Sequence, residues 1–182
     1  MASIEAPARP RSSSAVKRAF ERYPFLPALI ILVVLIALNG WFQPRSLSLV
    51  GVTGLVKTYL ALMLLAVAQT YVIYAGDIDL SAGAIVSLVN VVIVGVMAQW
   101  GGDGVTIVAA LAIGLATGLA CGIVNGIVVA ALRLQAIVAT FATSIFFTGL
   151  ALYIQPVAGT PAPTAFWRTY GGRFLDVPFV FY

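Results

Sequence analysis

The sequence predicts an all-α protein: a polytopic transmembrane helical bundle with about five spans and the beginning of a truncated sixth. Of its 182 residues, 62% are hydrophobic and only 9% are charged, whereas a soluble domain carries about 25% charged residues. The apolar residues form continuous runs rather than the alternating pattern of a membrane β-barrel strand. Continuous runs indicate helices, whose backbone hydrogen bonds are satisfied within each span.

Five apolar runs are long enough to cross a hydrocarbon core of roughly 30 Å at about 1.5 Å per residue. We place these spans near residues 25–42, 55–75, 81–100, 105–131 and 136–155, within one transmembrane domain that covers residues 23–182. Proline and glycine residues from Pro156 onward break any long helix there. The chain turns apolar again at residues 177–182, which we interpret as the start of a sixth span cut short.

Residues 1–22 form a basic segment that we expect to be a mobile cytoplasmic tail. It holds five of the ten basic residues of the chain: Arg9, Arg11, Lys17, Arg18 and Arg22. An excess of Lys and Arg before the first span favours a cytoplasmic N-terminus. Because so much of the positive charge is gathered in this tail, the formal charge of +4 does not indicate a nucleic-acid partner.

This orientation places the 43–54 and 101–104 loops outside and the 76–80 and 132–135 loops inside. Aromatic side chains favour membrane–water boundaries, and four of them fall at predicted outer boundaries: Trp41, Trp100, Tyr153 and Trp167. Three arginines argue the other way because this topology places them outside: Arg45, Arg168 and Arg173. Together, the basic tail and the aromatic residues favour a cytoplasmic N-terminus.

The stretch AGDIDLSAG at residues 75–83 places two carboxylates between apolar spans. An aspartate near the bilayer centre costs roughly 2.5–3.5 kcal/mol on insertion scales, so these residues need a helix terminus, a loop or a wet site. We expect Asp79 or Ser81 to cap the following helix, with Asp77 near its positive dipole end and Gly83 completing the motif. The alternative is functional: the carboxylates pair with a basic residue across an interface that moves.

Small residues recur every four positions in the span 105–131. The ridge contains Gly114, Gly118, Gly122 and Gly126, flanked by Ala110 and Ala130. Such small-xxx-small patterns let neighbouring helices approach closely. We therefore assign these glycines to helix packing in preference to a role in lining a substrate path.

Polar side chains inside the spans are candidates for a substrate pathway. In the span 136–155, three hydroxyls recur at four-residue intervals beside aromatic rings, an arrangement that suits a polyol. With the amides of two earlier spans, the candidate pathway residues are Gln69, Asn90, Thr140, Ser144, Phe147 and Thr148. The alternative is structural, because such residues, Asn125 among them, also bond to their own backbone or join helices.

The sequence offers little material for catalysis. It has no histidine and a single cysteine, Cys121, which removes His-based triads and most zinc sites. It also lacks a Walker loop and a nucleophile elbow. Two carboxylates in one short turn are poorly placed to share a proton as in an aspartic protease. We therefore expect no enzyme activity, no cofactor and no metal site.

Three motifs in order carry a resemblance to a known family. They are AGDIDLSAG at 75–83, GLACGIVNGIVV at 118–129 and LQAIVATFATSIFFTGLALYI at 134–154. In this order the chain resembles, over residues 40–182, the inner-membrane permease subunits of ribose/xylose-type sugar ABC transporters, which are similar to branched-chain amino acid permeases. It departs from them at Thr148, where many members carry arginine, and at Asp77, where a second glycine is frequent. Members are about twice as long, so the chain looks like the N-terminal half of one.

The resemblance implies a passive sugar pathway in the bacterial plasma membrane. Its implied partners are a second permease subunit, identical or different, a cytoplasmic ATP-binding subunit that hydrolyses ATP, and a periplasmic sugar-binding protein. The coupling segment lies in the second half of family members, so we expect no transport from these 182 residues alone. Two other functions stay open: an amino-acid permease of the same superfamily, and a non-transporting scaffold or degenerate half-permease.

Overall fold

A computed structural model describes residues 15–157, 159–174 and 177–178. The chain divides between Leu55 and Val56 into two compact units. Helix α3 (Leu49–Tyr74) begins in the first unit and continues into the second. The elements of each unit follow from local signals in the sequence, and only the second unit contains the polar residues that carry the candidate sites.

The first unit holds α1 (Ala15–Arg22), α2 (Leu26–Phe42) and the short 3-10 turn η1 (Pro44–Leu47). Within the expected tail, residues 15–22 form helix α1. An exposed i,i+4 contact of 3.9 Å between Lys17 and Glu21 supports this helix. A proline in the first turn of α2 suits the helix start, where its missing N–H has no partner to lose.

Helix α3 begins at Leu49, earlier than the expected residue 55. The Ser48 hydroxyl accepts a hydrogen bond from the Gly51 amide at 3.2 Å, which caps the first turn. Gly51 also lies directly against the backbone oxygens of Arg45 and Ser46, where a Cβ atom would collide with them. A cap and a close approach therefore extend the helix beyond its purely apolar part.

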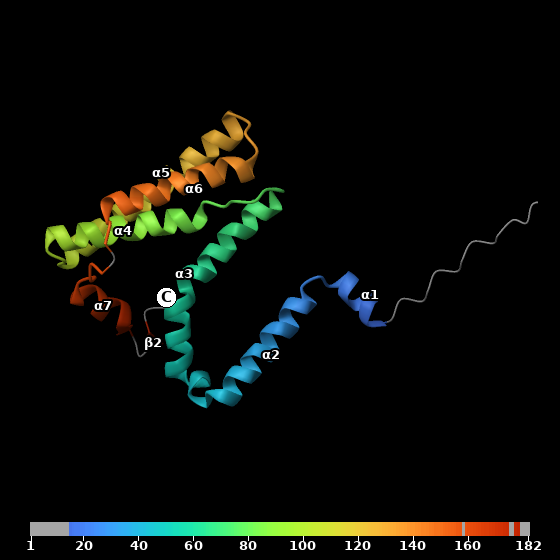
Figure 1. Ribbon diagram of the computed structural model, residues 1–182. Coiled ribbons are helices and arrows are strands. Elements are labelled where there is room, and N and C mark those ends of the chain that lie inside the picture. The colour runs from blue at the N-terminus through green and yellow to red at the C-terminus, as the bar shows by residue number, and fades with distance from the viewer. Residues whose placement is uncertain (1–14, 158, 175–176, 179–182) are drawn as a thin grey trace, which may run out of the picture. The chain divides into compact units, whose positions relative to one another are not determined.

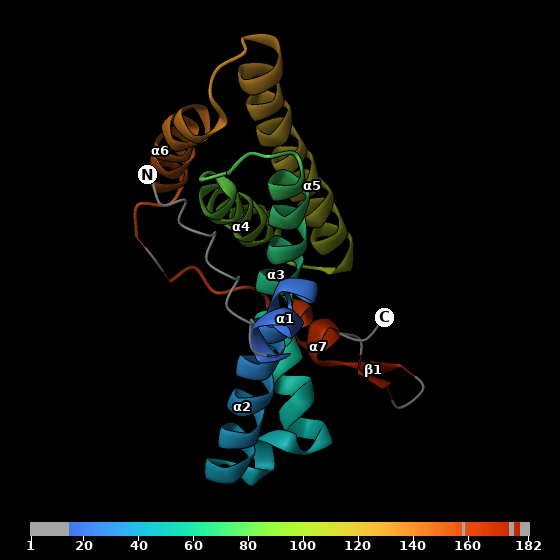
Figure 2. The same ribbon diagram turned by 90° about the vertical axis from the view of Figure 1, so that its right-hand side faces the viewer.

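The second unit is built around α4 (Ala82–Trp100), which lies between α5 (Gly104–Gly126) and α6 (Ala136–Ile154) (Figures 1 and 2). Helix α5 continues into the π-helical turn η2 (Ile127–Ala131). One buried cluster joins all three helices through Leu88, Cys121, Phe147 and Ala151. A second cluster lies nearer the C-terminal end of α4 and contains Met97, Ile107 and Ala110.

Helix α7 (Thr164–Gly171) closes this C-terminal end of α4. Its Phe166 packs against the second cluster, and Tyr170 donates a hydrogen bond of 2.7 Å to the Lys57 carbonyl of α3. Gly102, at φ +67°, lies against the Pro163 ring so closely that a Cβ atom would collide with it. The segment after α6 is therefore folded back over the α4–α5 loop and fastened to α3.

The α4–α5 loop ends in a helix cap. Asp103 is the N-cap of α5, and its carboxylate accepts a hydrogen bond from the Thr106 amide at 2.9 Å. Hydrogen bonding from Thr106 lowers the pKa of Asp103, because it favours the charged carboxylate. Asp103 therefore caps the start of α5 with a hydrogen bond that also favours its charged form.

The architecture confirms the predicted class, an all-α polytopic membrane protein. Four helices in the described part of the chain are long and apolar enough to cross a membrane: Leu49–Tyr74, Ala82–Trp100, Gly104–Ala131 and Ala136–Ile154. Helix α2 is apolar but shorter, with 17 residues. The antiparallel pair β1 (Arg173–Phe174) and β2 (Val177–Pro178) adds two residues per strand. Residues 179–182 of the expected sixth span lie outside the described residues.

Candidate functional site

The acidic turn between α3 and α4 is organised by Asp79. Its carboxylate oxygen Oδ1 accepts hydrogen bonds from the Ser81 amide at 2.7 Å and from the Ser81 hydroxyl at 2.6 Å. Ser81 occupies the N-cap position of α4 and is fully buried, but its hydroxyl accepts no hydrogen bond from the first turn of the helix. Asp79 thus satisfies the N–H of the cap residue, one of the four that a helix start leaves open.

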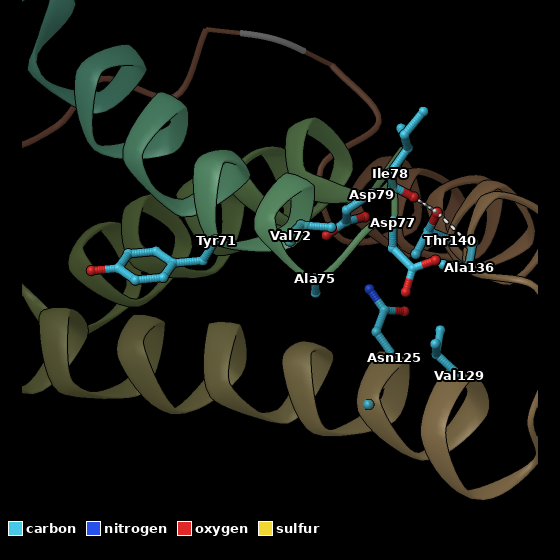
Figure 3. Close-up of a pocket in the computed structure, with 11 residues that line it drawn as sticks. Tyr71, Val72, Ala75, Asp77, Ile78, Asp79, Asn125, Val129, Ala136 and Thr140 are labelled. Atoms are coloured by element: carbon cyan, nitrogen blue, oxygen red, sulfur yellow. Dashed lines mark hydrogen bonds between the residues drawn. The ribbon is translucent and has the colours of Figure 1, made fainter.

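Asn125 of α5 joins this arrangement from a position 44 residues later. Its amide nitrogen donates to the Ser81 hydroxyl oxygen at 2.6 Å. Because the single Ser81 hydroxyl proton goes to Asp79, the amide of Asn125 must point its nitrogen at Ser81. The carbonyl oxygen Oδ1 of Asn125 is then buried and has no hydrogen-bond partner among the residues that the structure describes. Figure 3 shows the Asn125 side chain directed from α5 toward the turn.

Thr140 of α6 holds the same turn from the other side. Its hydroxyl accepts a hydrogen bond from the Leu80 amide at 3.0 Å. The same hydroxyl donates a hydrogen bond to the Ala136 carbonyl at 2.8 Å (Figure 3). Gln69 of α3 donates to the Asp79 carbonyl at 3.4 Å. The turn is therefore bonded to α3, α5 and α6, and we call Gln69, Asp79, Ser81, Asn125 and Thr140 the turn clamp.

A pocket of about 340 Å³ lies against the turn clamp (Figure 3). Most of its lining is apolar, and the polar exceptions include Asp77, which is exposed, and Asn125 and Thr140 of the turn clamp. The lining residues are Tyr71, Val72, Ala75, Asp77, Ile78, Asp79, Asn125, Gly126, Val129, Ala136 and Thr140. The acidic motif predicted from the sequence thus borders a cavity, with Asp77 exposed and Asp79 half-buried.

The π-helical turn η2 shapes one wall of this pocket. The Leu132 amide bonds to the Ile127 carbonyl at 3.0 Å, five residues back, and Val129 lines the cavity. Arg133 then adopts φ +55°, a left-handed conformation that costs a non-glycine residue about 1–2 kcal/mol. Single π-helical turns inside α-helices occur frequently at functional sites.

The predicted pathway residues do not share one surface. Thr140 and Phe147 are buried at 4% and 3% exposure, whereas Thr148 is exposed. Ser144 donates to the Phe141 carbonyl at 2.7 Å, so its hydroxyl bonds back to its own helix. The physical reason is rotation, since each four-residue step turns about 40° around a helix of 3.6 residues per turn.

The glycine ridge is used unevenly among the described residues. A Cβ atom on Gly114 would collide with the Ile93 side chain of α4, and one on Gly118 would touch Val89 at 3.5 Å. Cβ atoms on Gly122 and Gly126 would meet open space, as would one on Gly83. Close approach of α4 and α5 is therefore concentrated at Gly114.

A second pocket, of about 410 Å³, lies toward the C-terminal ends of α4 and α6. It is lined by Asn90, Val91, Val94, Leu152, Gln155, Pro156, Gly159 and Thr160. Sequence reasoning singled out Asn90 but missed Gln155 and Thr160. Gln155 could have been found from its position in the sequence, because it is a polar amide residue at the end of the last apolar span.

No group of three His, Cys, Asp or Glu side chains in the described part of the chain is arranged to hold a metal ion. The helices and their apolar surfaces define the class: a multi-pass helical membrane protein. No protein-family model matches the chain, and no solved structure matches it significantly.

Comparison with curated proteins gives the nearer relationship. The chain is 34% identical over 158 residues to the ribose import permease protein RbsC of Bacillus subtilis strain 168, covering 85% of this chain and 47% of that protein. It is 31% identical to RbsC of Escherichia coli strain K12, covering 83% of this chain and 47% of that protein. The predicted resemblance to permease subunits of sugar ABC transporters is thereby confirmed. The chain spans about half the length of these relatives.

Proposed function

We propose that this chain is a membrane-spanning permease subunit of an ATP-driven sugar importer. The observation that carries the proposal is the similarity to ribose import permeases over 85% of the chain. In this function the chain contributes helices that line or move the sugar pathway and does not itself hydrolyse ATP. Ribose is the substrate in the names of the relatives, and a pentose is the first sugar to test.

The turn clamp supports a mechanical role for the acidic motif. The Ser81 hydroxyl donates to Asp79 and accepts from Asn125, so these polar atoms connect the start of α4 to α5. Thr140 fastens the same turn to α6. A permease needs helices that shift as units when its ATP-binding partner closes, and fastened helix ends transmit such a shift better than free ones.

The partners and orientation follow from the same proposal. We place the N-terminus in the cytoplasm of a bacterial plasma membrane, with the turn clamp at the cytoplasmic end and the Asp103 loop at the periplasmic end. A cytoplasmic ATP-binding subunit then lies on the side of Asp77, and a periplasmic sugar-binding protein delivers its ligand near α7. A second permease subunit, identical or different, completes the pathway.

The proposal is tested in the bacterium that encodes the chain. An affinity tag on the chain is used to purify its complex from solubilised membranes, and ATP hydrolysis is measured after adding ribose-loaded periplasmic sugar-binding protein. We expect hydrolysis to rise with the loaded sugar-binding protein and to stay at its basal rate with a leucine-loaded binding protein. A response to the leucine-loaded protein alone, or a complex without ATP hydrolysis, contradicts the proposal.

A further inference from the structure

The second pocket has a lining that differs from that of the first. It lies between α4, α6 and the chain that follows α6, and its volume of about 410 Å³ falls within the range of small-molecule sites. Its polar side chains are the amides of Asn90 and Gln155 and the hydroxyl of Thr160. None of its lining residues carries a charge.

Asn90 is the residue that most needs an explanation. It lies in the middle of α4, an apolar helix long enough to span a membrane, and its side chain is exposed. A polar side chain at membrane depth is costly unless it faces other polar groups, water or a ligand. Asn90 and Gln155 line the same pocket, so both amides can contact a ligand that is bound there.

The chemistry of this lining selects one class of ligand. Amides both donate and accept hydrogen bonds, which matches the hydroxyl groups of a sugar. The side chains of Val91, Val94 and Leu152 offer apolar surface for the C–H groups of a sugar ring. A zwitterionic amino acid, in contrast, would leave two charges without partners in a lining of neutral groups, which is unfavourable.

We propose that this pocket is a subsite for an uncharged monosaccharide, with Asn90 and Gln155 as its hydrogen-bonding residues. The inference rests on the proposed import function and deepens it by naming where the sugar touches the chain. Under the proposed orientation the pocket lies in the periplasmic half of the membrane. It is separate from the cavity at the turn clamp and shares no lining residue with it.

A cysteine reporter tests the subsite in the membrane-embedded complex. Cys121, the single native cysteine, is buried and can be replaced in a Cys121→Ser background. Val94→Cys then places a thiol in the pocket, and its modification by a charged, water-soluble thiol reagent is timed in membranes. We expect millimolar D-ribose to slow this modification, whereas L-leucine leaves it unchanged. Val105→Cys, on an exposed site of α5 outside the pocket, should show no protection.

Matched variants assign the protection to the amides. Asn90→Leu in the reporter background should raise the ribose concentration for half protection about tenfold, the expected loss for one ligand hydrogen bond. Gln155→Leu should act in the same direction. Gln99→Leu removes an exposed amide of the same helix outside the pocket and should leave protection unchanged. Monodisperse elution and an unaltered thermal midpoint establish that each variant is folded.

The outcomes separate this inference from the function on which it rests. Absence of ribose protection, equal protection by L-leucine, or protection unaffected by Asn90→Leu and Gln155→Leu overturns the subsite. If sugar-stimulated ATP hydrolysis persists in that case, the importer proposal stands without it. Ribose protection that depends on Asn90 supports the subsite even where ATP hydrolysis fails to respond, and the importer proposal alone is then overturned.

Discussion

The hydroxyl oxygen of Ser81 lies 2.6 Å from the amide nitrogen of Asn125, and this hydrogen bond joins the start of α4 to the end of α5. Ser81 simultaneously bonds Asp79, so one buried hydroxyl connects a loop carboxylate with an amide 44 residues away. The acidic motif thus belongs to an interhelical hydrogen-bond network and also forms the start of α4.

Replacing this hydroxyl should weaken the folded unit. Ser81→Ala leaves the Asn125 amide nitrogen without its acceptor and removes a donor from Asp79. We expect a loss of about 1–2 kcal/mol, the upper range for interhelical hydrogen bonds in membranes. Reversible unfolding in mixed micelles measures this loss. Ser87→Ala is the control, because the Ser87 hydroxyl donates to the Gly83 carbonyl within its own helix. Equal effects of the two variants would contradict the connecting role.

The Thr140 hydroxyl should stabilise the fold, because it accepts a hydrogen bond from the Leu80 amide. Thr140→Val keeps the shape of the side chain and removes the acceptor, which should cost about 1–2 kcal/mol because a part-buried amide loses its partner. Thr117→Val is the matched control, since the Thr117 hydroxyl donates to the Ile113 carbonyl within α5. Hydrogen exchange at Leu80 should also accelerate in Thr140→Val. An unchanged exchange rate would count against the bond.

The uneven glycine ridge predicts different tolerance along α5. Gly114→Ala places a Cβ atom against Ile93 and should destabilise the unit by about 1–3 kcal/mol, the range for overpacking. Gly122→Ala enters open space in this chain and gains about 1 kcal/mol of helix propensity at most. Thermal midpoints of the two variants in the same detergent provide the comparison. A larger loss at Gly122 would indicate that a further helix covers that position.

Asp103 predicts a dependence of stability on pH. Its pKa is lowered in the folded state, so the unfolded state binds more protons at acidic pH and stability rises with pH there. The contribution is complete above the ordinary aspartate pKa of about 3.9 and is lost as the pH falls through the folded-state pKa. Asp103→Asn keeps a capping oxygen without a titrating carboxyl, so its unfolding midpoint should fall less steeply on acidification. Parallel curves for the two proteins would contradict this assignment.

The helices could be predicted from the sequence because apolar runs are a local signal. The run around Leu88 and the run around Phe147 each identify a helix without knowledge of the other. The early start of α3 was missed because it depends on the Ser48 hydroxyl, a capping contact that hydrophobicity does not register. Helix α1 was missed for a related reason, since its charged residues resemble a tail.

The candidate sites could be predicted only in part. The sequence indicated that the acidic motif, Asn90 and Thr140 are unusual among apolar neighbours. It could not indicate that Thr140 would meet Leu80 or that Gln155 would share a hollow with Asn90, because those meetings depend on how three helices pack. Contacts across 60 positions arise from tertiary structure, and a pattern of spacing along one helix does not contain them.

The hydrogen bond from Tyr170 to Lys57 gives α3 a second fixed point, far along the helix from the acidic turn. A helix that is fixed at one point can pivot about that point. A helix that is fixed at two points moves together with the two segments that hold it. Between Lys57 and Gln69, α3 is therefore held at two points, by α7 at Lys57 and by the acidic turn at Gln69. Under the proposed orientation, α3 thus connects the acidic turn at the cytoplasmic end of the helices with α7 at the periplasmic end.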